Sequence, residues 1–151
     1  MAIEFFHIRE NDDQLVEQLI DLEATSFGDK GLQSWEILSL IRYARVYVAA
    51  EYDELLGYVY FIKCFDDPSK AVLQTVSIKP SESGRNVGVS LIISALSDLR
   101  ESGIHRAEVC VDPTNYKALK IYREQLGFSV VESTKFEPDP DSEMLILQKN
   151  L

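Results

Sequence analysis

The residues best suited to bind an anion lie in one turn that runs from Lys79 to Ser90. The turn leaves a β-rich run and opens a helical pattern, and free backbone N–H groups at the start of a helix attract phosphate. Arg85 offers a guanidinium that pairs with phosphate, while Gly88 and the small Ser90 let the backbone approach an anion closely. The segment is not a P-loop, because no Gly-Lys-Ser/Thr follows. By itself it fits a phosphate site or a plain structural turn.

The elements around this turn are predicted from the spacing of apolar residues. Leu15, Leu19 and Leu22 recur at helical spacing, and Asn11 with Gln14 is typical of a capping box at the start of that first helix. Seven strands are expected at residues 3–9, 46–51, 55–65, 71–78, 105–111, 128–132 and 144–148.

Three more helices complete the pattern. Ser34 is predicted to cap the second helix, and the third and fourth are expected at residues 86–102 and 115–126. The breaker stretch from Gly28 to Gly31 separates the first two helices and is a candidate lip for a substrate. The chain begins with β-rich segments and continues in the order β-α-β-α-β. This order predicts an α/β fold in which helices cover both faces of a mixed sheet. At 151 residues, one domain over residues 1–151 is expected.

A known family shares the anion-binding turn. Arg85-x-x-Gly88-x-Ser90 resembles the Arg/Gln-x-x-Gly-x-Gly/Ala signature of the GNAT superfamily of N-acetyltransferases, with Ser90 in place of Gly or Ala. The resemblance implies a central, mostly antiparallel twisted sheet of about seven strands, and acetyl-CoA as the co-substrate.

A second stretch, downstream, carries the same resemblance. Asn115-x-x-Ala118-x-x-x-Tyr122-x-x-x-x-Gly127-Phe128 is similar to the family's "N..A...Y....GF" segment. Both motifs stand in the family's order, and the order of elements agrees over essentially the whole chain. The first 45 residues match only as a pattern of helices and strands.

The resemblance assigns the cofactor site residue by residue. The pantetheine arm is implied to lie in a V-shaped opening between the fourth and fifth strands, where it pairs with Val76, Ser77 and Ile78. Asn115 is implied to help hold that arm. The pyrophosphate is implied to lie on the loop made of Arg85, Asn86, Val87, Gly88, Val89 and Ser90. Nearby cations suit a polyanionic ligand, although the last three also fit a solvated helix face: Lys79, Arg85, Lys117, Lys120 and Arg123.

Acid and base chemistry is expected from two side chains. The resemblance makes Tyr122 the general acid for the departing CoA thiolate, and a phenol with a pKa of about 10 stays protonated at neutral pH. When the resemblance is set aside, the spacing predicts that Tyr122 is a core tyrosine on one helical face with Ala118 and Leu126. Glu108 is the candidate general base, directly or through a water chain. Some family members carry Glu where this chain has Cys110, a cysteine that fits a small buried hydrophobe.

The net charge of the chain limits the classes of binding partner to expect. The formal charge of −10 lacks the electrostatic footprint of a nucleic-acid binder. A cationic amine is a candidate acceptor, and a solvated acidic loop is the alternative explanation of the acidic residues around Lys135. Those acidic residues are Glu132, Glu137, Asp139, Asp141 and Glu143.

The remaining features concern location and assembly. The N-terminus shows no signal or transit pattern, and no apolar run approaches the length of a membrane span. Two cysteines, Cys64 and Cys110, suit a reducing compartment, so a cytoplasmic protein without membrane association is expected. No metal site is predicted, and a homodimer stays open.

The sequence supports two alternative functions. The first is acetyl transfer from acetyl-CoA to an amine by direct attack in a ternary complex; the amine is a small cationic amine, a lysine side chain or a peptide N-terminus. The second is a non-catalytic acyl-CoA-binding sensor or scaffold, motivated by the missing carboxylate at Cys110.

Overall fold

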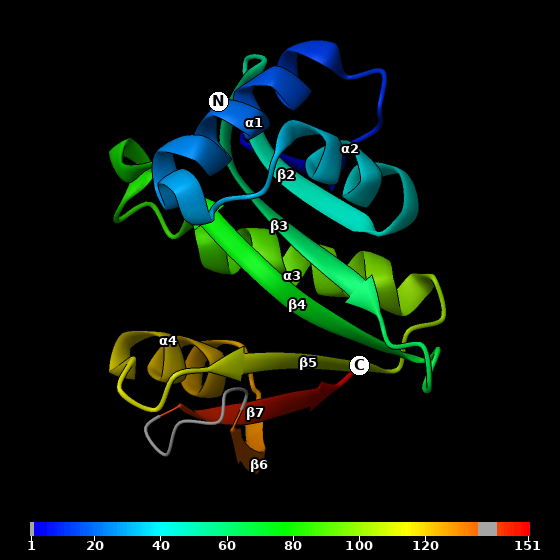
Figure 1. Cartoon of the computed structure of the whole chain (residues 1–151), viewed down its shortest axis with the longest axis vertical. Coiled ribbons are helices and arrows are strands. Elements are labelled where there is room, and N and C mark those ends of the chain that lie inside the picture. The colour runs from blue at the N-terminus through cyan, green and yellow to red at the C-terminus, as the bar shows by residue number, and fades with distance from the viewer. Residues whose placement is uncertain (1, 136–141) are drawn as a thin grey trace. The chain divides into compact units, whose positions relative to one another are not determined.

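The computed structural model describes residues 2–135 and 142–151. Seven strands form an open mixed sheet in the order β1-β2-β3-β4-β5-β7-β6, accompanied in the described residues by four α-helices (Figure 1). The predicted mixed α/β sheet is therefore confirmed. Contacts divide the chain into two compact units: unit one is Met1–Ile62 with Thr75–Ala95, and unit two is Lys63–Gln74 with Leu96–Leu151.

Unit one is built on an antiparallel sheet. Its strands are β1 (Glu4–His7), β2 (Arg45–Glu51), β3 (Glu54–Lys63, which ends in unit two) and the last residues of β4 (Lys70–Ile78). β2 and β3 pair as an antiparallel hairpin. Its turn residues Tyr52 and Asp53 have φ of 53° and 62°, the left-handed pair that a tight two-residue hairpin turn requires.

The helices of unit one cover both faces of its strands. α1 (Asp13–Phe27) and α2 (Ser34–Tyr43) bury Leu19 and Ile41 against β2 and β3. The 3₁₀ turn η1 (Gly28–Lys30) follows α1. Ser77 of β4 hydrogen-bonds to Ser26 of α1, so its neighbour Ile78 faces the opposite way because side chains alternate along a strand. That opposite face meets the first turn of α3 (Val87–Glu101).

Both predicted helix caps in this unit are wrong. Asp12, not Asn11, precedes α1, and its Oδ2 accepts the Arg9 N–H at 2.8 Å, which holds the chain out of the helix for one more residue. Ser34 is the first residue of α2, and Gln33 is the cap. The Gln33 N–H donates to Glu36 Oε1 at 3.0 Å, so the helix begins one residue earlier than the hydroxyl of Ser34 indicated.

Unit two places β5 (Arg106–Val111) between β4 and β7 (Glu143–Asn150), with β6 (Ser129–Lys135) outside β7. β4 and β5 pair in parallel, from Lys70–Leu73 to Arg106–Val109.

The predicted fourth helix is an α-helical turn that changes into a π-turn. α4 (Tyr116–Lys120) continues as η3 (Ile121–Gln125), where the Leu126 N–H donates to the Ile121 carbonyl at 3.0 Å. The wider i→i+5 bonding ends at Gly127, which has a φ of 77°. Nowhere in residues 2–135 and 142–151 is a helix long and apolar enough to cross a membrane.

Candidate active site

The predicted phosphate turn lies in unit one. After β4 ends at Ile78, the Lys79 N–H donates to the Leu56 carbonyl at 2.8 Å and the short 3₁₀ turn η2 (Pro80–Glu82) follows. Asn86, with a φ of 59°, leads directly into α3. The Ser90 N–H is taken by the Asn86 carbonyl at 3.1 Å. The amides just before it have no partner further back in the helix and are suited to an anion.

Gly88 lies on the side of α3 that faces β4. A Cβ placed on Gly88 would lie 3.4 Å from Ile78 Cγ1, an ordinary van der Waals distance. Packing against the described residues therefore does not require a glycine here. The missing side chain instead keeps the first turn of the helix open to a close-lying ligand.

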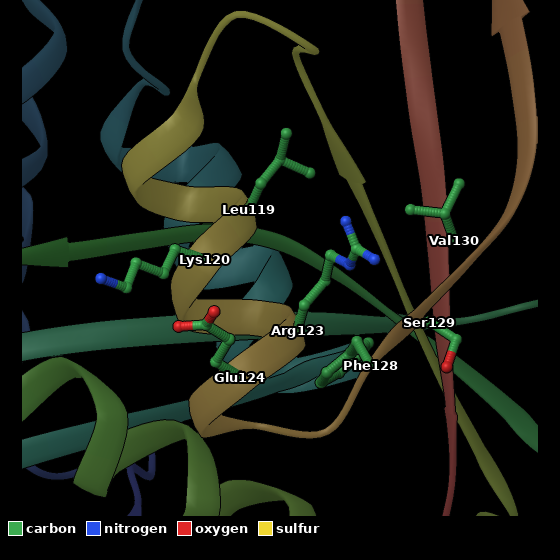
Figure 2. Close-up of a pocket in the computed structure, with 7 residues that line it drawn as sticks. All are labelled: Leu119, Lys120, Arg123, Glu124, Phe128, Ser129 and Val130. Atoms are coloured by element: carbon green, nitrogen blue, oxygen red, sulfur yellow. The ribbon is translucent and has the colours of Figure 1, made fainter.

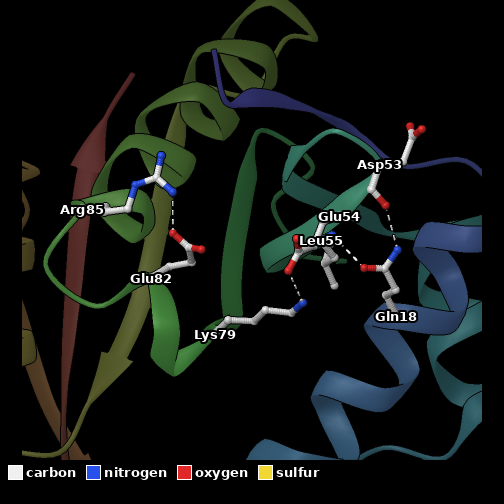
Figure 3. A network of polar contacts seen from close by, with 7 residues as sticks. All are labelled: Gln18, Asp53, Glu54, Leu55, Lys79, Glu82 and Arg85. Atoms are coloured by element: carbon white, nitrogen blue, oxygen red, sulfur yellow. Dashed lines mark hydrogen bonds and ion pairs between the residues drawn. The ribbon is translucent and has the colours of Figure 1, made fainter. Parts of the chain in front are cut away.

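Arg85, the predicted phosphate ligand, is already bound by two carboxylates. Its guanidinium donates to Glu82 Oε2 at 2.7 Å and to Glu51 Oε2 at 3.4 Å (the Glu82 contact is drawn in Figure 3). The hydrogen bonds that Arg85 donates to Glu51 and Glu82 raise the pKa of its guanidinium. The Arg85 side chain is 45% exposed, so solvent and an anionic ligand both reach it.

Lys79 is paired in the same manner with the β2–β3 turn. Its Nζ lies 3.3 Å from Glu54 Oε1 (Figure 3). Gln18 of α1 fixes that turn, because its Nε2 donates to the Asp53 carbonyl at 2.9 Å and its Oε1 accepts the Leu55 N–H at 2.8 Å. A well-held hairpin thus brings carboxylates to both cations of the phosphate turn, which the sequence analysis did not foresee.

The predicted cofactor strand, Val76–Ile78, lies unusually close to β3. A Cβ at Gly57 would come within 2.8 Å of the Ser77 carbonyl oxygen and 2.4 Å of Ile78 Cδ1, so only glycine fits there. Ser77 is 7% exposed, and its hydroxyl lies 2.8 Å from that of Ser26.

Unit one also holds a buried carboxylate that was not predicted from the sequence. Glu23 of α1 is 2% exposed; its Oε1 accepts the Tyr58 hydroxyl hydrogen, and its Oε2 accepts the Leu32 N–H at 2.8 Å. Burial, followed by the hydrogen bond and charge of Glu23, raises the pKa of Tyr58 far above its ordinary value. Tyr58 stacks on Tyr60 with ring centroids 6.3 Å apart. The available signal was a glutamate on the apolar stripe of a helix, four residues after Leu19.

Tyr122 lies in unit two, on the π-turn. It is 7% exposed, and its ring meets Phe128 edge-on at 5.5 Å between centroids. Burial raises the pKa of Tyr122 to about 12. Within residues 2–135 and 142–151, no group hydrogen-bonds the Tyr122 hydroxyl. The phenol therefore stays protonated at neutral pH and has its hydrogen available to donate.

Asn115 is the N-cap of α4. Its Oδ1 accepts the Ala118 N–H at 3.2 Å, which leaves the side-chain NH₂ as its remaining donor. The predicted contact with the cofactor arm can use that NH₂, the second lone pair of Oδ1 or the backbone.

Glu108 is held between its neighbouring strands. Its Oε1 lies 3.2 Å from Lys70 Nζ and accepts a hydrogen bond from Gln148 Nε2 at 2.8 Å, and its side chain is 16% exposed. These contacts favour a structural role in the sheet, and catalysis by Glu108 stays a prediction. Burial, and then the charge of Glu108, raises the pKa of the Cys110 thiol, so this thiol is not a ready nucleophile at neutral pH.

Two of the three cations predicted on the fourth helix, Lys120 and Arg123, line an open pocket in unit two, and Lys117 does not. The pocket measures about 860 Å³, and Figure 2 shows its lining residues, Leu119, Lys120, Arg123, Glu124, Phe128, Ser129 and Val130. Arg123 extends toward the strand that carries Val130, whereas Lys120 points away from it. These two cations are thus placed differently, although they lie on one helix.

The acidic segment is described only at its ends. Ser133 donates to Glu143 Oε1 at 2.6 Å across β6 and β7, and Glu132 is exposed. Glu137, Asp139 and Asp141 lie outside the described residues.

The predicted site residues belong to both units. Unit one brings together Val76–Ile78 and the turn from Arg85 to Ser90, and unit two holds Glu108, Asn115 and Tyr122. The residues of each set are held by the contacts described above within their own unit.

The Acetyltransferase (GNAT) family model matches residues 12–128. This chain therefore belongs to the GNAT acetyltransferase family.

Individual relatives agree with this assignment. A mycothiol acetyltransferase of Streptosporangium roseum is 39% identical over 54 residues, which are 36% of this chain; the match spans only 16% of that protein. A crystal structure of aminoglycoside 6′-N-acetyltransferase with coenzyme A is similar with a TM-score of 0.81 at 15% identity, over 97% of this chain and 96% of that one. The ribosomal-protein-S18-alanine N-acetyltransferase of Escherichia coli gives a TM-score of 0.78 at 14% identity, over 99% and 94%. At these identities the two structures are evidence of the fold.

Proposed function

We propose that this chain is an N-acetyltransferase that moves the acetyl group of acetyl-CoA to an amine. The observation that carries the proposal is the turn in unit one, where Arg85 and the open helix start at Gly88 follow directly after β4. Membership of the GNAT family supports it. Amine classes named in the comparisons, aminoglycosides and the alanine of a ribosomal protein, guide the choice of acceptors to test.

The residues present fit the co-substrate. Backbone N–H groups at Val87, Gly88 and Val89 are suited to the pyrophosphate, with Arg85 beside them. Glu51 and Glu82 orient the Arg85 guanidinium before a phosphate arrives, and their charge opposes the same phosphate. Backbone groups of Val76–Ile78 would hold the pantetheine arm and polarise the thioester carbonyl. Bound acetyl-CoA supplies an activated acetyl group.

Tyr122 is the proposed general acid. Its buried hydroxyl keeps its proton at neutral pH and donates it to the sulfur as the thiolate leaves. The protonated Cys110 thiol supports direct attack by the amine over an acetyl-cysteine intermediate. The acceptor ammonium must also lose a proton; Glu108 was the sequence-based candidate for this step, but its contacts with Lys70 and Gln148 favour a structural role, and Glu108→Gln tests the two alternatives.

The test is thiol release from acetyl-CoA with polyamines, aminoglycosides, lysine peptides and peptides with a free N-terminus. Release with one class, accompanied by an acetylated product of the correct mass, is expected. Tight binding of acetyl-CoA with no release across the panel would favour the acyl-CoA-binding sensor or scaffold instead. Absence of both binding and release would contradict either function.

A further inference from the structure

Glu23 is a buried carboxylate whose partners are neutral. The described residues place no lysine, arginine or histidine in an ion pair with it, and its two oxygens face the Tyr58 hydroxyl and the Leu32 N–H. A charge buried in this way loses its hydration, and neutral donors compensate that loss less fully than a cation does. For packing alone, an apolar side chain would serve at least as well.

The same network leads from Glu23 to the strand proposed to bind the acetyl donor. Tyr58 donates its hydroxyl hydrogen to Glu23, and the nearby Ser77 side chain lowers the pKa of Tyr58 that burial and Glu23 raise. Ser77 in turn shares a 2.8 Å hydrogen bond with Ser26, an exposed residue near the end of α1. Four side chains thus connect α1 with the C-terminal end of β4.

In the other direction, Glu23 holds the loop between α1 and α2. Its Oε2 binds the Leu32 N–H, and the Gly31 N–H closes the preceding turn on the Gly28 carbonyl at 3.0 Å. The loop from Gly28 to Leu32, called the lip below, is therefore anchored on Glu23. Both its anchor and the end of β4 lie in unit one.

We propose that Glu23 is a positioning residue for the acceptor amine: through Tyr58 and the Leu32 amide it fixes the lip relative to Ser77 at the end of β4. The proposal rests on the proposed function, because the end of β4 is where the acetyl donor is taken to bind. An amine that approaches along the lip then meets the thioester at a set distance. Small displacements from a reactive geometry are costly in rate. Glu23 itself does not touch the substrate, since it is 2% exposed.

Two variants separate this role from simple stability. Tyr58→Phe removes one hydroxyl and leaves the Glu23 bond to the Leu32 amide in place, whereas Glu23→Gln removes the charge at both contacts. Glu17→Gln makes the same chemical change at an exposed position of the same helix and serves as the matched control. Tyr58→Phe also keeps the test valid if Glu23→Gln fails to fold.

Three measurements are made on the full chain: hydrogen exchange of the lip, the dissociation constant of acetyl-CoA, and KM and kcat for the best amine of the panel. For Glu23→Gln, lip exchange should quicken about tenfold and kcat/KM for the amine should fall about tenfold, with acetyl-CoA binding within about twofold. Tyr58→Phe should show the same pattern with smaller changes, and Glu17→Gln should match the wild type.

Each other outcome has one meaning. Lip exchange equal to the wild type in Glu23→Gln overturns the anchoring of the lip. Quicker exchange with unchanged KM and kcat overturns the positioning role and leaves a structural one. No thiol release by the wild type with any amine overturns the proposed function, and the positioning role with it, and is recognised by the wild type alone.

Discussion

Two buried tyrosines, Tyr58 in unit one and Tyr122 in unit two, show what distinguishes a structural phenol from one available for chemistry. Burial raises the pKa of both. Tyr58 is 0% exposed and its hydroxyl donates to Glu23. The Tyr122 hydroxyl has no hydrogen-bond partner in the described part of the chain. A hydrogen already donated to a buried carboxylate is not available to a leaving group, so burial alone does not identify an acid.

Arg85 is intermediate between these two cases. It has two carboxylate partners, yet it is half exposed, so an anionic ligand can replace or join them. Tyr58, Arg85 and Tyr122 thus form a series in which the protein's own hydrogen bonds leave the polar group progressively more available to a ligand.

The largest effect is expected for Tyr122→Phe. Loss of the proposed acid should lower kcat by about 100-fold or more, with acetyl-CoA binding unchanged within about twofold. Steady-state kinetics and calorimetric titration measure the two quantities. Tyr116→Phe, at a 77% exposed position of the same helical segment, is the control and should behave as the wild type. Full activity of Tyr122→Phe would remove the distinction between the two tyrosines.

The second prediction concerns alkaline pH. The pKa of Tyr122 is about 12 in the folded chain and about 10 when unfolded, so its contribution to stability is complete below pH ~10 and is lost as pH rises through ~12. Between pH ~9 and ~11 the wild type should lose about 1 kcal/mol more than Tyr122→Phe. Urea unfolding at the two pH values measures this. Equal losses would mean that the phenol ionises as freely in the folded chain as in water.

A smaller effect is expected for Glu82→Gln. Removing the carboxylate 2.7 Å from Arg85 lowers the negative potential at the phosphate turn, so the dissociation constant of acetyl-CoA should fall. A change of about threefold at low salt, fading at high salt, is expected for a partly exposed pair. Glu17→Gln is again the control. Weaker binding in Glu82→Gln would show that orientation of Arg85 outweighs the repulsion.

The smallest effect is expected for Glu108→Gln. Because Glu108 Oε1 is engaged by Lys70 and Gln148, kcat/KM for the amine should stay within about threefold at every pH tested. A fall of about 100-fold with loss of the acidic limb of the pH profile would instead assign Glu108 as the general base.

Much of the fold could be predicted from the sequence because its signals are local. Apolar periodicity and the breaker stretch from Gly28 to Gly31 located the strands and helices to within a few residues. The caps at Asn11 and Ser34 were wrong because a neighbouring side chain, Asp12 or Glu36, made the deciding hydrogen bond. The π-turn after Lys120 has no local signal that the pattern of apolar residues would show.

The site was predicted less completely, since its missing parts are contacts between distant residues. Glu51 is 34 residues from Arg85 and Glu54 is 25 from Lys79. Glu23 and Tyr58 are 35 apart. The two motifs point to cations and a phenol, but pairing across such separations depends on the tertiary fold, which a single sequence does not display.

The approach of β3 to β4 at Gly57 has a consequence for sequence variation. Since a Cβ at Gly57 would press on the carbonyl oxygen of Ser77, any side chain there must push the end of β4 away from its place. In a library of single substitutions selected for acetyl transfer, position 57 should be as intolerant as position 88. Even an added methyl group at position 57 would displace the end of β4, the segment proposed to bind the acetyl donor.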